Sequence, residues 1–381
     1  MIDLAFCLLG IAIGLVLGFL PAMHVNNFLP FFALLSMTSP QLFLFVIAMS
    51  IAYVFSSFFP SVLLGVPNED TALNVLPGHR MVLEGNAYSA IMISLYAGLF
   101  VTVLSVPFLI FFLSALTIVY AALQKVIPYL LIFVVIFMFF SDKKSSIIII
   151  VLSSILGFLT FDFNLLLPIL TGFFGMSTIL SAYSSQSKIP PQILRFNSGM
   201  TLYDLSIVSF MSSFLSSIFG FIPAISSAIV GTIGSYMRKL NSEEFLALLS
   251  GTNVNYMAYS FFALLLLHKT RSGSAVLLSK FFQSESIFFV LGIILFSSAI
   301  SFLICARLAK PIIRLYCRID YRKACLFSII LMVSVNAVLT GWFGVLVLFA
   351  STSIGLLSNS LRVKRINCMA ALIVPTIAVL L

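Results

Sequence analysis

Uncharged apolar sequence dominates this chain of 381 residues. Between Asp3 and Glu69 there is no Asp, Glu, Lys or Arg, and only 8% of all residues are charged. With 61% hydrophobic residues and a mean hydropathy of +1.21, the chain has more apolar surface than a soluble core could bury. We therefore expect an integral membrane protein. A membrane-spanning helix needs about 20 apolar residues, so the chain has room for roughly 10–12 membrane segments, some of them re-entrant.

The apolar runs are continuous and do not alternate with a period of two, which favours helices over the strands of a barrel. The predicted fold class is an all-α polytopic membrane protein. The first segment, MIDLAFCLLGIAIGLVLGFL, has no basic start or small-residue cleavage site and is expected to remain as the first helix. The net charge of +9 comes from bases beside apolar segments, which indicates membrane orientation and not a nucleic-acid surface.

An internal repeat divides the sequence. GFLP from Gly18 is matched by GFIP from Gly220, and SSILGFL from Ser153 is matched by STSIGLL from Ser351. Both matches have an offset of about 200 residues, as a duplicated unit would give. A third match, of GVPNED from Gly65 with GTNVNY, needs gaps. We expect a first inverted repeat at 1–183, a linker at 184–200 and a second inverted repeat at 201–381.

The charges indicate that the two repeats have opposite topology. Lys143 and Lys144 precede one segment, whereas Arg362 and Arg365 follow its equivalent in the second repeat. If basic loops stay in the cytoplasm, equivalent helices run in opposite directions. The same rule places the linker and residues 307–323 in the cytoplasm. Both termini are then expected outside a plasma membrane that the chain crosses several times.

Helix-breaking residues recur at matching places in the two repeats. The predicted breaks are Gly18–Pro21, Gly65–Pro67, Gly220–Pro223 and Gly251–Asn253. Interrupted helices in inverted repeats are typical of secondary transporters, because the freed backbone groups bind solutes and ions near the bilayer midplane.

Polar residues around these breaks form the predicted site. Amide, hydroxyl and imidazole groups can hold a polar solute, and a guanidinium binds a carboxylate through two parallel hydrogen bonds. Carboxylate and backbone oxygens suit sodium. The residues predicted to bind substrate are Pro21, His24, Asn26, Asn27, Pro67, Asn68, Thr71, Asn74, Arg80, Ser226, Ser227, Thr252, Asn253 and Asn255, and those predicted for cation coupling are Gly65, Glu69, Asp70 and Gly251.

Each of these residues also has a structural interpretation. The residues after Pro21 could form an interfacial turn that faces water, and the serines after Pro223 could serve close helix packing. Arg80 could pair with a neighbouring acid such as Glu84, or anchor the membrane edge. Asp162 and Asp204 lie near predicted segment ends, where solvation is a sufficient explanation for an acid.

The order of these motifs resembles a known family. A Gly-x-x-Pro break, then GVP followed by a threonine and GHRMVLEG, and a second GFIP are similar to elements of the large membrane subunit of the tripartite tricarboxylate transporters (TctA-type). The resemblance covers nearly the whole chain, which looks like a short, divergent member. It implies a tricarboxylate substrate and two partners, a small membrane subunit and an extracytoplasmic solute-binding protein. The positions carried over from the family are Pro21, Pro67, Thr71, Pro223 and Gly251.

Three hypotheses about function follow. The first is a secondary transporter of an anionic solute, a di- or tricarboxylate, which uses no cofactor but a sodium ion or proton for coupling. The second is an intramembrane enzyme in which Glu69, Asp70 and Glu84 bind a metal and His79 is the acid or base. The third is an accessory subunit without a site. The paired breaks favour the transporter, and a homo-oligomer is left open.

Overall fold

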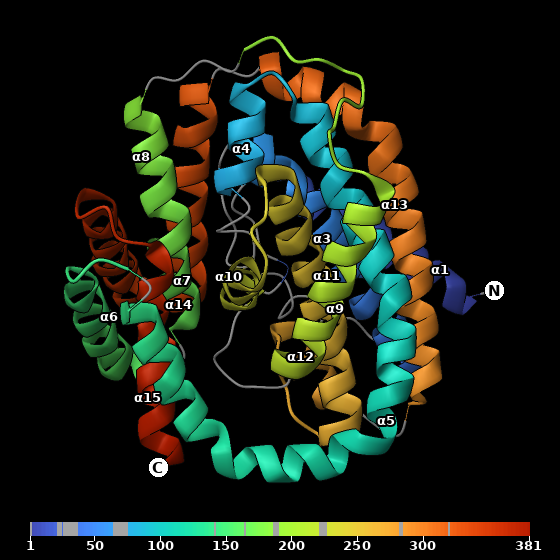
Figure 1. The fold of residues 1–381 in the computed structure, drawn as a ribbon, viewed down its shortest axis with the longest axis horizontal. Helices are drawn as coiled ribbons and strands as arrows, with labels where there is room; N and C mark the ends of the chain where they lie inside the picture. Colours follow the sequence, from blue (N-terminus) through green and yellow to red (C-terminus); the bar gives the residue numbers. More distant parts are fainter. Residues whose placement is uncertain are drawn as a thin grey trace. The chain divides into compact units, whose positions relative to one another are not determined.

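The structure, a computed structural model, describes residues 2–20, 25, 37–63, 75–140, 142–163, 165–185, 190–220, 227–281, 285–318 and 321–381. Every regular element in these ranges is a helix (Figure 1). Five described helices are long and apolar enough to cross a membrane, and shorter apolar helices accompany them. The prediction of an all-α polytopic membrane protein is confirmed.

The chain divides into two compact units that do not coincide with the predicted repeats. Unit 1 comprises Met1–Val66, Asp70–Ser114 and Lys188–Asp320, and unit 2 comprises Pro67–Glu69, Ala115–Ser187 and Tyr321–Leu381. Each unit therefore contains segments from both halves of the sequence.

Unit 1 holds the first helices of each half. They are α1 (Ile2–Phe19), α3 (Ser39–Leu63), α4 (Val75–Leu83), the first part of α5 (Ala87–Phe140), α9 (Leu202–Phe219), α10 (Ser227–Met237), α11 (Ser242–Leu267), α12 (Gly273–Ser279) and α13 (Ile287–Arg318).

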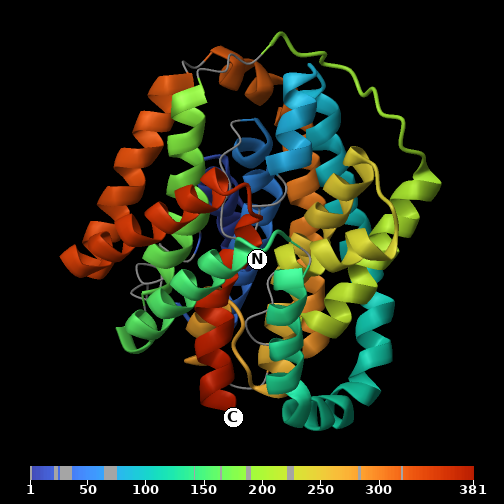
Figure 2. The same cartoon turned by 60° about the vertical axis from the view of Figure 1, so that its left-hand side comes forward.

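Unit 2 holds the later helices of each half. They are the second part of α5, α6 (Ser146–Thr160), α7 (Leu166–Leu170), a π-helical segment (Thr171–Met176), α8 (Ser177–Ser185), α14 (Tyr321–Ser360) and α15 (Ala370–Leu380), with short 3-10 turns at Phe161–Phe163 and Arg365–Met369. Both Figure 1 and Figure 2 show α8 running beside α14.

Glycines on one face of α1 bring its backbone against the backbone of α3. A Cβ atom added at Gly10 would lie 2.3 Å from the carbonyl oxygen of Phe45, and one added at Gly14 would lie 2.2 Å from that of Met49. At Gly18 the nearest backbone atom would be the Tyr53 oxygen at 2.6 Å. Small residues of this kind permit close helix packing where lipid removes the hydrophobic drive between helices.

Helix bounds recur at the spacing of the predicted repeat. Both α1 and α9 have 18 residues and end at a phenylalanine, Phe19 and Phe219. A helix of 25 residues, α3, corresponds to one of 26 residues, α11. Each is followed by a short helix, α4 or α12, and then by a long one that begins at Ala87 or Ile287. Apart from α10, which has no counterpart among the described helices, the order of elements is thus the same in both halves of unit 1.

Contacts in unit 2 are reciprocal between the two halves. Ser153 on α6 donates a hydrogen bond to the carbonyl oxygen of Asn367 at 3.4 Å, and Ser351 on α14 donates to that of Pro168 at 3.0 Å.

Glycines repeat this reciprocal pattern one turn further along each helix. A Cβ atom added at Gly157 would lie 2.0 Å from the Ala371 oxygen, and one added at Gly355 would lie 2.7 Å from the Phe173 oxygen. Gly157 and Gly355 are as far apart in the sequence as Phe173 and Ala371. Reciprocal contacts are expected when a two-fold axis relates two copies of one segment.

Unit 1 also joins the two halves through exchanged helices. In it, α3 packs against α13 of the other half. Its counterpart α11 meets α5, where a Cβ atom added at Gly98 would lie 3.1 Å from Val254 and one added at Gly251 would lie 2.7 Å from Val101. In unit 1, α3 of the first half therefore packs against the second half, and α11 of the second half packs against the first.

The described part of the predicted linker is hydrogen-bonded to the residues around the turn between α4 and α5. The side chain of Gln192 accepts a hydrogen bond from the Ala87 amide at 2.9 Å and donates one to the Val82 oxygen at 2.9 Å. The Ile193 amide donates to the Gly85 oxygen at 2.8 Å. The linker thus follows the turn between α4 and α5.

The predicted breaks agree with the helix ends, with one exception. Helices end at Phe19, Leu63 and Phe219, next to the breaks predicted at Gly18, Gly65 and Gly220. The break predicted at Gly251–Asn253 is wrong, because α11 continues through these residues to Leu267.

The register of the weakest repeat match is also different. When the starts of α3 and α11 are aligned, GTNVNY falls opposite Ala48–Tyr53 and not opposite the segment from Gly65.

We predict that Gly14→Ala destabilises the protein. The added methyl group would overlap the Met49 carbonyl, so α1 must move away from α3 at a cost of about 1–3 kcal/mol. Thermal unfolding of the purified protein in detergent measures this as a lower midpoint. Gly292→Ala on α13 is the matched control, since no atom lies within 4 Å of its added Cβ. Equal midpoints for the two variants would contradict the close packing.

Candidate functional site

Many of the residues predicted from the helix breaks cannot be placed. Those that lie outside the described residues are Pro21, His24, Asn26, Asn27, Gly65, Pro67, Asn68, Glu69, Asp70, Thr71, Asn74, Pro223 and Ser226. Ser227 is described as the buried first residue of α10, which packs against α11.

The helices that flank the segment 64–74 are joined to each other. Nδ1 of His79 on α4 lies 3.2 Å from the carbonyl oxygen of Val62 at the end of α3. Because a carbonyl only accepts, the imidazole donates this hydrogen bond from Nδ1. Gly78 also fits closely there, since a Cβ atom added to it would lie 2.9 Å from Val62. The segment therefore starts and ends at adjacent points of unit 1.

Arg80 has a surface position and a partner. Its Nε donates to Glu84 at 3.1 Å, one helical turn along α4, and the two side chains are 71% and 53% exposed. An exposed pair of this kind contributes little to stability. The pair agrees with the structural interpretation of Arg80, and its role as the cation of the substrate site stays a prediction.

Packing explains why α11 is continuous at Gly251. The helix starts with a capping box, in which the Asn241 side chain accepts from the Glu244 amide and the Glu244 side chain accepts from the Asn241 amide. A glycine or asparagine destabilises a helix by about 1 kcal/mol at most. This cost is smaller than the stabilisation that α11 gains from burying a whole face. Gly251 instead permits close contact with Ser212, whose Oγ would lie 2.9 Å from an added Cβ atom.

The polar residues of α11 lie on two different faces. Thr252 and Asn255 face α9, where Thr252 is hydrogen-bonded to Ser212 at 3.2 Å and Asn255 donates to Ser213 at 3.1 Å. All four side chains are buried. This face joins two helices, and polar contacts between helices in a membrane commonly do so.

The second face of α11 meets the start of α12. Ser260 lies 3.0 Å from Ser272, which caps α12 by accepting from the Ala275 amide at 3.1 Å. On α3, Ser50 lies 2.7 Å from Ser274. These contacts fix the residues before α12 beside the last third of α11.

Buried polar groups gather on this second face. The Nδ2 atom of Asn253 and the hydroxyl of Tyr256 are buried and have no hydrogen-bond partner among the described residues. Nη1 of Arg271 is also buried, and its charge is close enough to interact with the Tyr256 hydroxyl. We call Asn253, Tyr256 and Arg271 the donor cluster. Leaving a buried polar group unpaired costs about 1–3 kcal/mol, so a partner for this cluster is expected.

The chemistry of the donor cluster suits an anion. An amide nitrogen, a phenolic hydroxyl and a guanidinium all present N–H or O–H groups, and the guanidinium adds a permanent positive charge. A carboxylate can accept from all three. Asn253 and Tyr256 share the segment GTNVNY, of which Asn253 was predicted as a site residue. Arg271 was not connected with them, because α12 turns back on α11 in a way that sequence spacing does not reveal.

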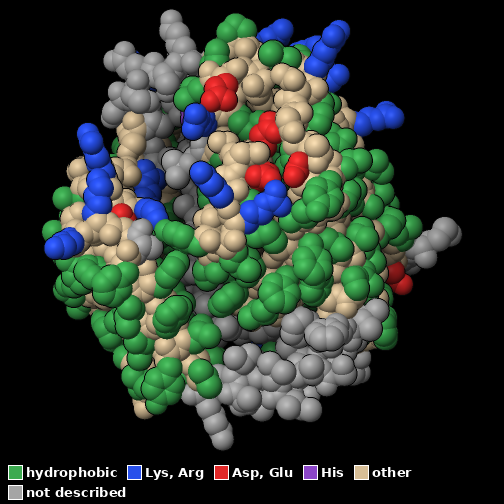
Figure 3. Space-filling model, in the orientation of Figure 1, with side chains coloured by type: hydrophobic (Ala, Val, Ile, Leu, Met, Phe, Trp, Pro, Cys, Tyr) green, Lys and Arg blue, Asp and Glu red, His purple; other side chains and the backbone are tan. Residues whose placement is uncertain are grey.

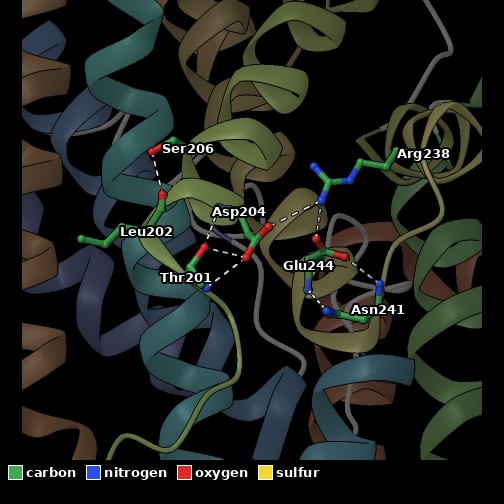
Figure 4. A network of polar contacts seen from close by, with 7 residues as sticks. All are labelled: Thr201, Leu202, Asp204, Ser206, Arg238, Asn241 and Glu244. Atoms are coloured by element: carbon green, nitrogen blue, oxygen red, sulfur yellow. Dashed lines mark hydrogen bonds and ion pairs between the residues drawn. The ribbon is translucent and has the colours of Figure 1, made fainter.

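A charged network fixes the starts of α9 and α11 (Figure 4). Arg238 contacts Glu244 at 2.9 Å and Asp204 at 3.5 Å. Asp204 also forms a capping box with Thr201 at the start of α9. Its structural interpretation is therefore sufficient, and this network lies at the helix ends and not in the donor cluster.

The described residues assigned to the metal enzyme have other partners. Glu84 pairs with Arg80 and His79 donates to Val62. Within the described ranges, no group of three or more His, Cys, Asp or Glu side chains could hold a metal ion.

Comparison with known proteins gives two matches and one negative result. The family model described as "Tripartite tricarboxylate transporter TctA family" matches residues 4–370. Uncharacterized protein MJ1079 of Methanocaldococcus jannaschii is 28% identical, over 99% of this chain and 98% of its own length. No solved structure was found to match the chain.

We predict that His79 makes stability depend on pH. Burial lowers the pKa of His79 below its ordinary value of 6.5, although the hydrogen bond to Val62 opposes the shift. The unfolded chain then binds a proton more readily than the folded one, so stability is lost as the pH falls below about 6.5. Thermal midpoints measured at pH 8 and pH 5 should differ more for the wild type than for His79→Gln. An identical pH dependence in both would contradict the prediction.

Proposed function

Because the chain belongs to the tripartite tricarboxylate transporter TctA family, a family of transporters and not of enzymes, we propose that it is the permease for an anionic organic solute, a di- or tricarboxylate. Transport is driven by a sodium or proton gradient. The family match and the apolar helices make it a multi-pass membrane protein and a transporter component. The solute, the coupling ion and the binding residues belong to the proposal.

The donor cluster is the observation that carries this assignment. Asn253 and Tyr256 lie about one turn apart on α11, both have a buried donor without a partner among the described residues, and the charge of Arg271 acts on Tyr256. Each charge-assisted hydrogen bond to a carboxylate contributes about 1.5–3 kcal/mol. Arg271, in place of Arg80, is therefore proposed to bind the solute.

Coupling is proposed to involve the segment between α3 and α4. Its residues Glu69 and Asp70 offer carboxylate oxygens, and Asn68 and Thr71 offer neutral ones, which are the ligands that sodium accepts. The joined ends of α3 and α4 support this idea, because both helices that flank the segment lie in unit 1 and α4 packs against α11.

Inverted repeats are proposed for the two halves. The reciprocal contacts of Ser153 and Ser351, and of Gly157 and Gly355, support a two-fold relation. The reversed charge pattern supports opposite orientation in the membrane, with the linker in the cytoplasm and both termini outside. Because the halves exchange helices within each unit, we propose that alternating access moves unit 1 and unit 2 as bodies, and not one half against the other.

Partners follow from the family. Its members work in tripartite systems, with a small membrane subunit and an extracytoplasmic solute-binding protein. We propose that this chain uses both. Transport in proteoliposomes that contain the chain alone should then be slower than with the two partners present.

Uptake in proteoliposomes tests the site. Labelled citrate or a smaller dicarboxylate is supplied with a sodium gradient, a proton gradient or neither. We expect Arg271→Gln to reduce uptake at low solute concentration by about 10- to 100-fold, since one charge-assisted hydrogen bond or more is lost. Asn253→Ala should have a smaller effect in the same direction.

Arg80→Gln is the matched control, because it removes the same charge from an exposed ion pair. Its uptake should stay close to that of the wild type. Arg271→Lys should retain part of the activity with a higher KM, because a lysine keeps the charge but not the bidentate geometry. If Arg271→Gln and Arg80→Gln transport equally well, the assigned site is wrong, whereas absence of carboxylate uptake by the wild type with both partners would reject the function.

A further inference from the structure

A basic stripe runs along the C-terminal end of α13. Arg307, Lys310, Arg314 and Arg318 are all exposed, and their spacing of three and four residues places them within about 80° of one another around the helix. The opposite side of the helix is buried inside unit 1, where it presents Cys305, Ala309, Ile313 and Tyr316. The last turns of α13 therefore have one buried face and one positively charged face.

The same exposed face is apolar nearer the start of the helix. Phe289, Phe296 and Leu303 follow each other along it and are 38%, 39% and 57% exposed. No Asp, Glu, Lys or Arg occurs in α13 before Arg307. Figure 3 shows this change on the side where α13 lies in Figure 1, with hydrophobic side chains in the middle and Lys and Arg side chains at the upper edge.

The length of α13 places the stripe outside the hydrocarbon. The helix has 32 residues and is therefore about 48 Å long, whereas the hydrocarbon core is only about 30 Å thick. If the uncharged part spans the core, Arg307 and Lys310 reach the level of the lipid phosphates and the last two arginines lie just beyond.

Among the described residues, no acid is found paired with the stripe. The contact found for Lys310 is with the ring of Tyr88, whose centroid lies 5.4 Å from Nζ. A row of bases that only set orientation could point in any direction. Here they share one face, and that face continues the exposed apolar face of the same helix.

We propose that the α13 stripe of Arg307, Lys310, Arg314 and Arg318 binds the phosphate groups of anionic phospholipids at the membrane surface. Arginine guanidinium groups bind phosphate oxygens through paired hydrogen bonds, and each base near an anionic surface strengthens the association several-fold. This inference depends on the chain being a membrane protein and not on the solute that it carries.

Lipid binding by the purified, delipidated protein tests the proposal. Phosphatidylglycerol or phosphatidylcholine is added in detergent, and bound lipids are counted by native mass spectrometry while the thermal midpoint is recorded. We expect the wild type to retain more phosphatidylglycerol and to gain stability from it. Both effects should weaken as NaCl rises from 0.05 to 0.5 M, because salt screens exposed charges.

Variants with matched charge separate the stripe from a general effect. The triple variant Arg307→Gln, Arg314→Gln, Arg318→Gln should bind phosphatidylglycerol on the order of 100-fold more weakly. The control Lys143→Gln, Lys144→Gln, Lys239→Gln loses the same charge at other exposed positions and should bind like the wild type. A variant with lysine at the three arginine positions should keep most of the binding and shows that the stripe can be changed without misfolding.

Two outcomes would overturn the proposal. One is equal binding of phosphatidylglycerol and phosphatidylcholine by the wild type, and the other is an equal loss in the stripe variant and in the control.

Discussion

Backbone contact at glycines is the interaction on which the rest of this structure depends. In a membrane, apolar side chains gain little by leaving lipid, so helices associate where their backbones can come close together. Gly10 and Gly14 provide this contact between α1 and α3, and Gly157 provides it between α6 and α15. In the most apolar 18-residue stretch of α3, 94% of the residues are buried.

Sequence patterns predicted the helices well, and most of the helix ends. Gly-Phe-Leu-Pro and Gly-Phe-Ile-Pro mark the ends of α1 and α9 because proline restricts the backbone on both sides of it. At Gly251 the prediction failed, since no proline is present and the break was inferred from the weak helix propensity of Gly and Asn and from a gapped repeat match with GVPNED. There the contacts with Ser212 and Val101 stabilise a continuous helix. Propensity decides where packing is absent, and α11 is packed on most sides.

The site was harder to predict than the fold. Arg80 was predicted to bind substrate because its guanidinium can bind a carboxylate through two hydrogen bonds. In the structure, an acid one turn away on the same helix, Glu84, is its partner. Arg271 lies in a short basic stretch whose place in the membrane the charges do not indicate. Its approach to Tyr256 depends on α12 turning back along α11, which the Ser260–Ser272 contact fixes. Such proximity is a property of tertiary structure and leaves no local pattern.

The division of the chain into units constrains how a solute could be carried. Asn253, Tyr256 and Arg271 all belong to unit 1. Separation of the two sequence halves would break the packing of α3 on α13 and of α11 on α5, whereas the proposed movement of whole units leaves this packing intact. In the proposed mechanism, a carboxylate held by donors from one unit would keep its hydrogen bonds during that movement. The free energy of desolvation would then oppose binding only on entry, because the contacts that hold the solute would be the same in both states.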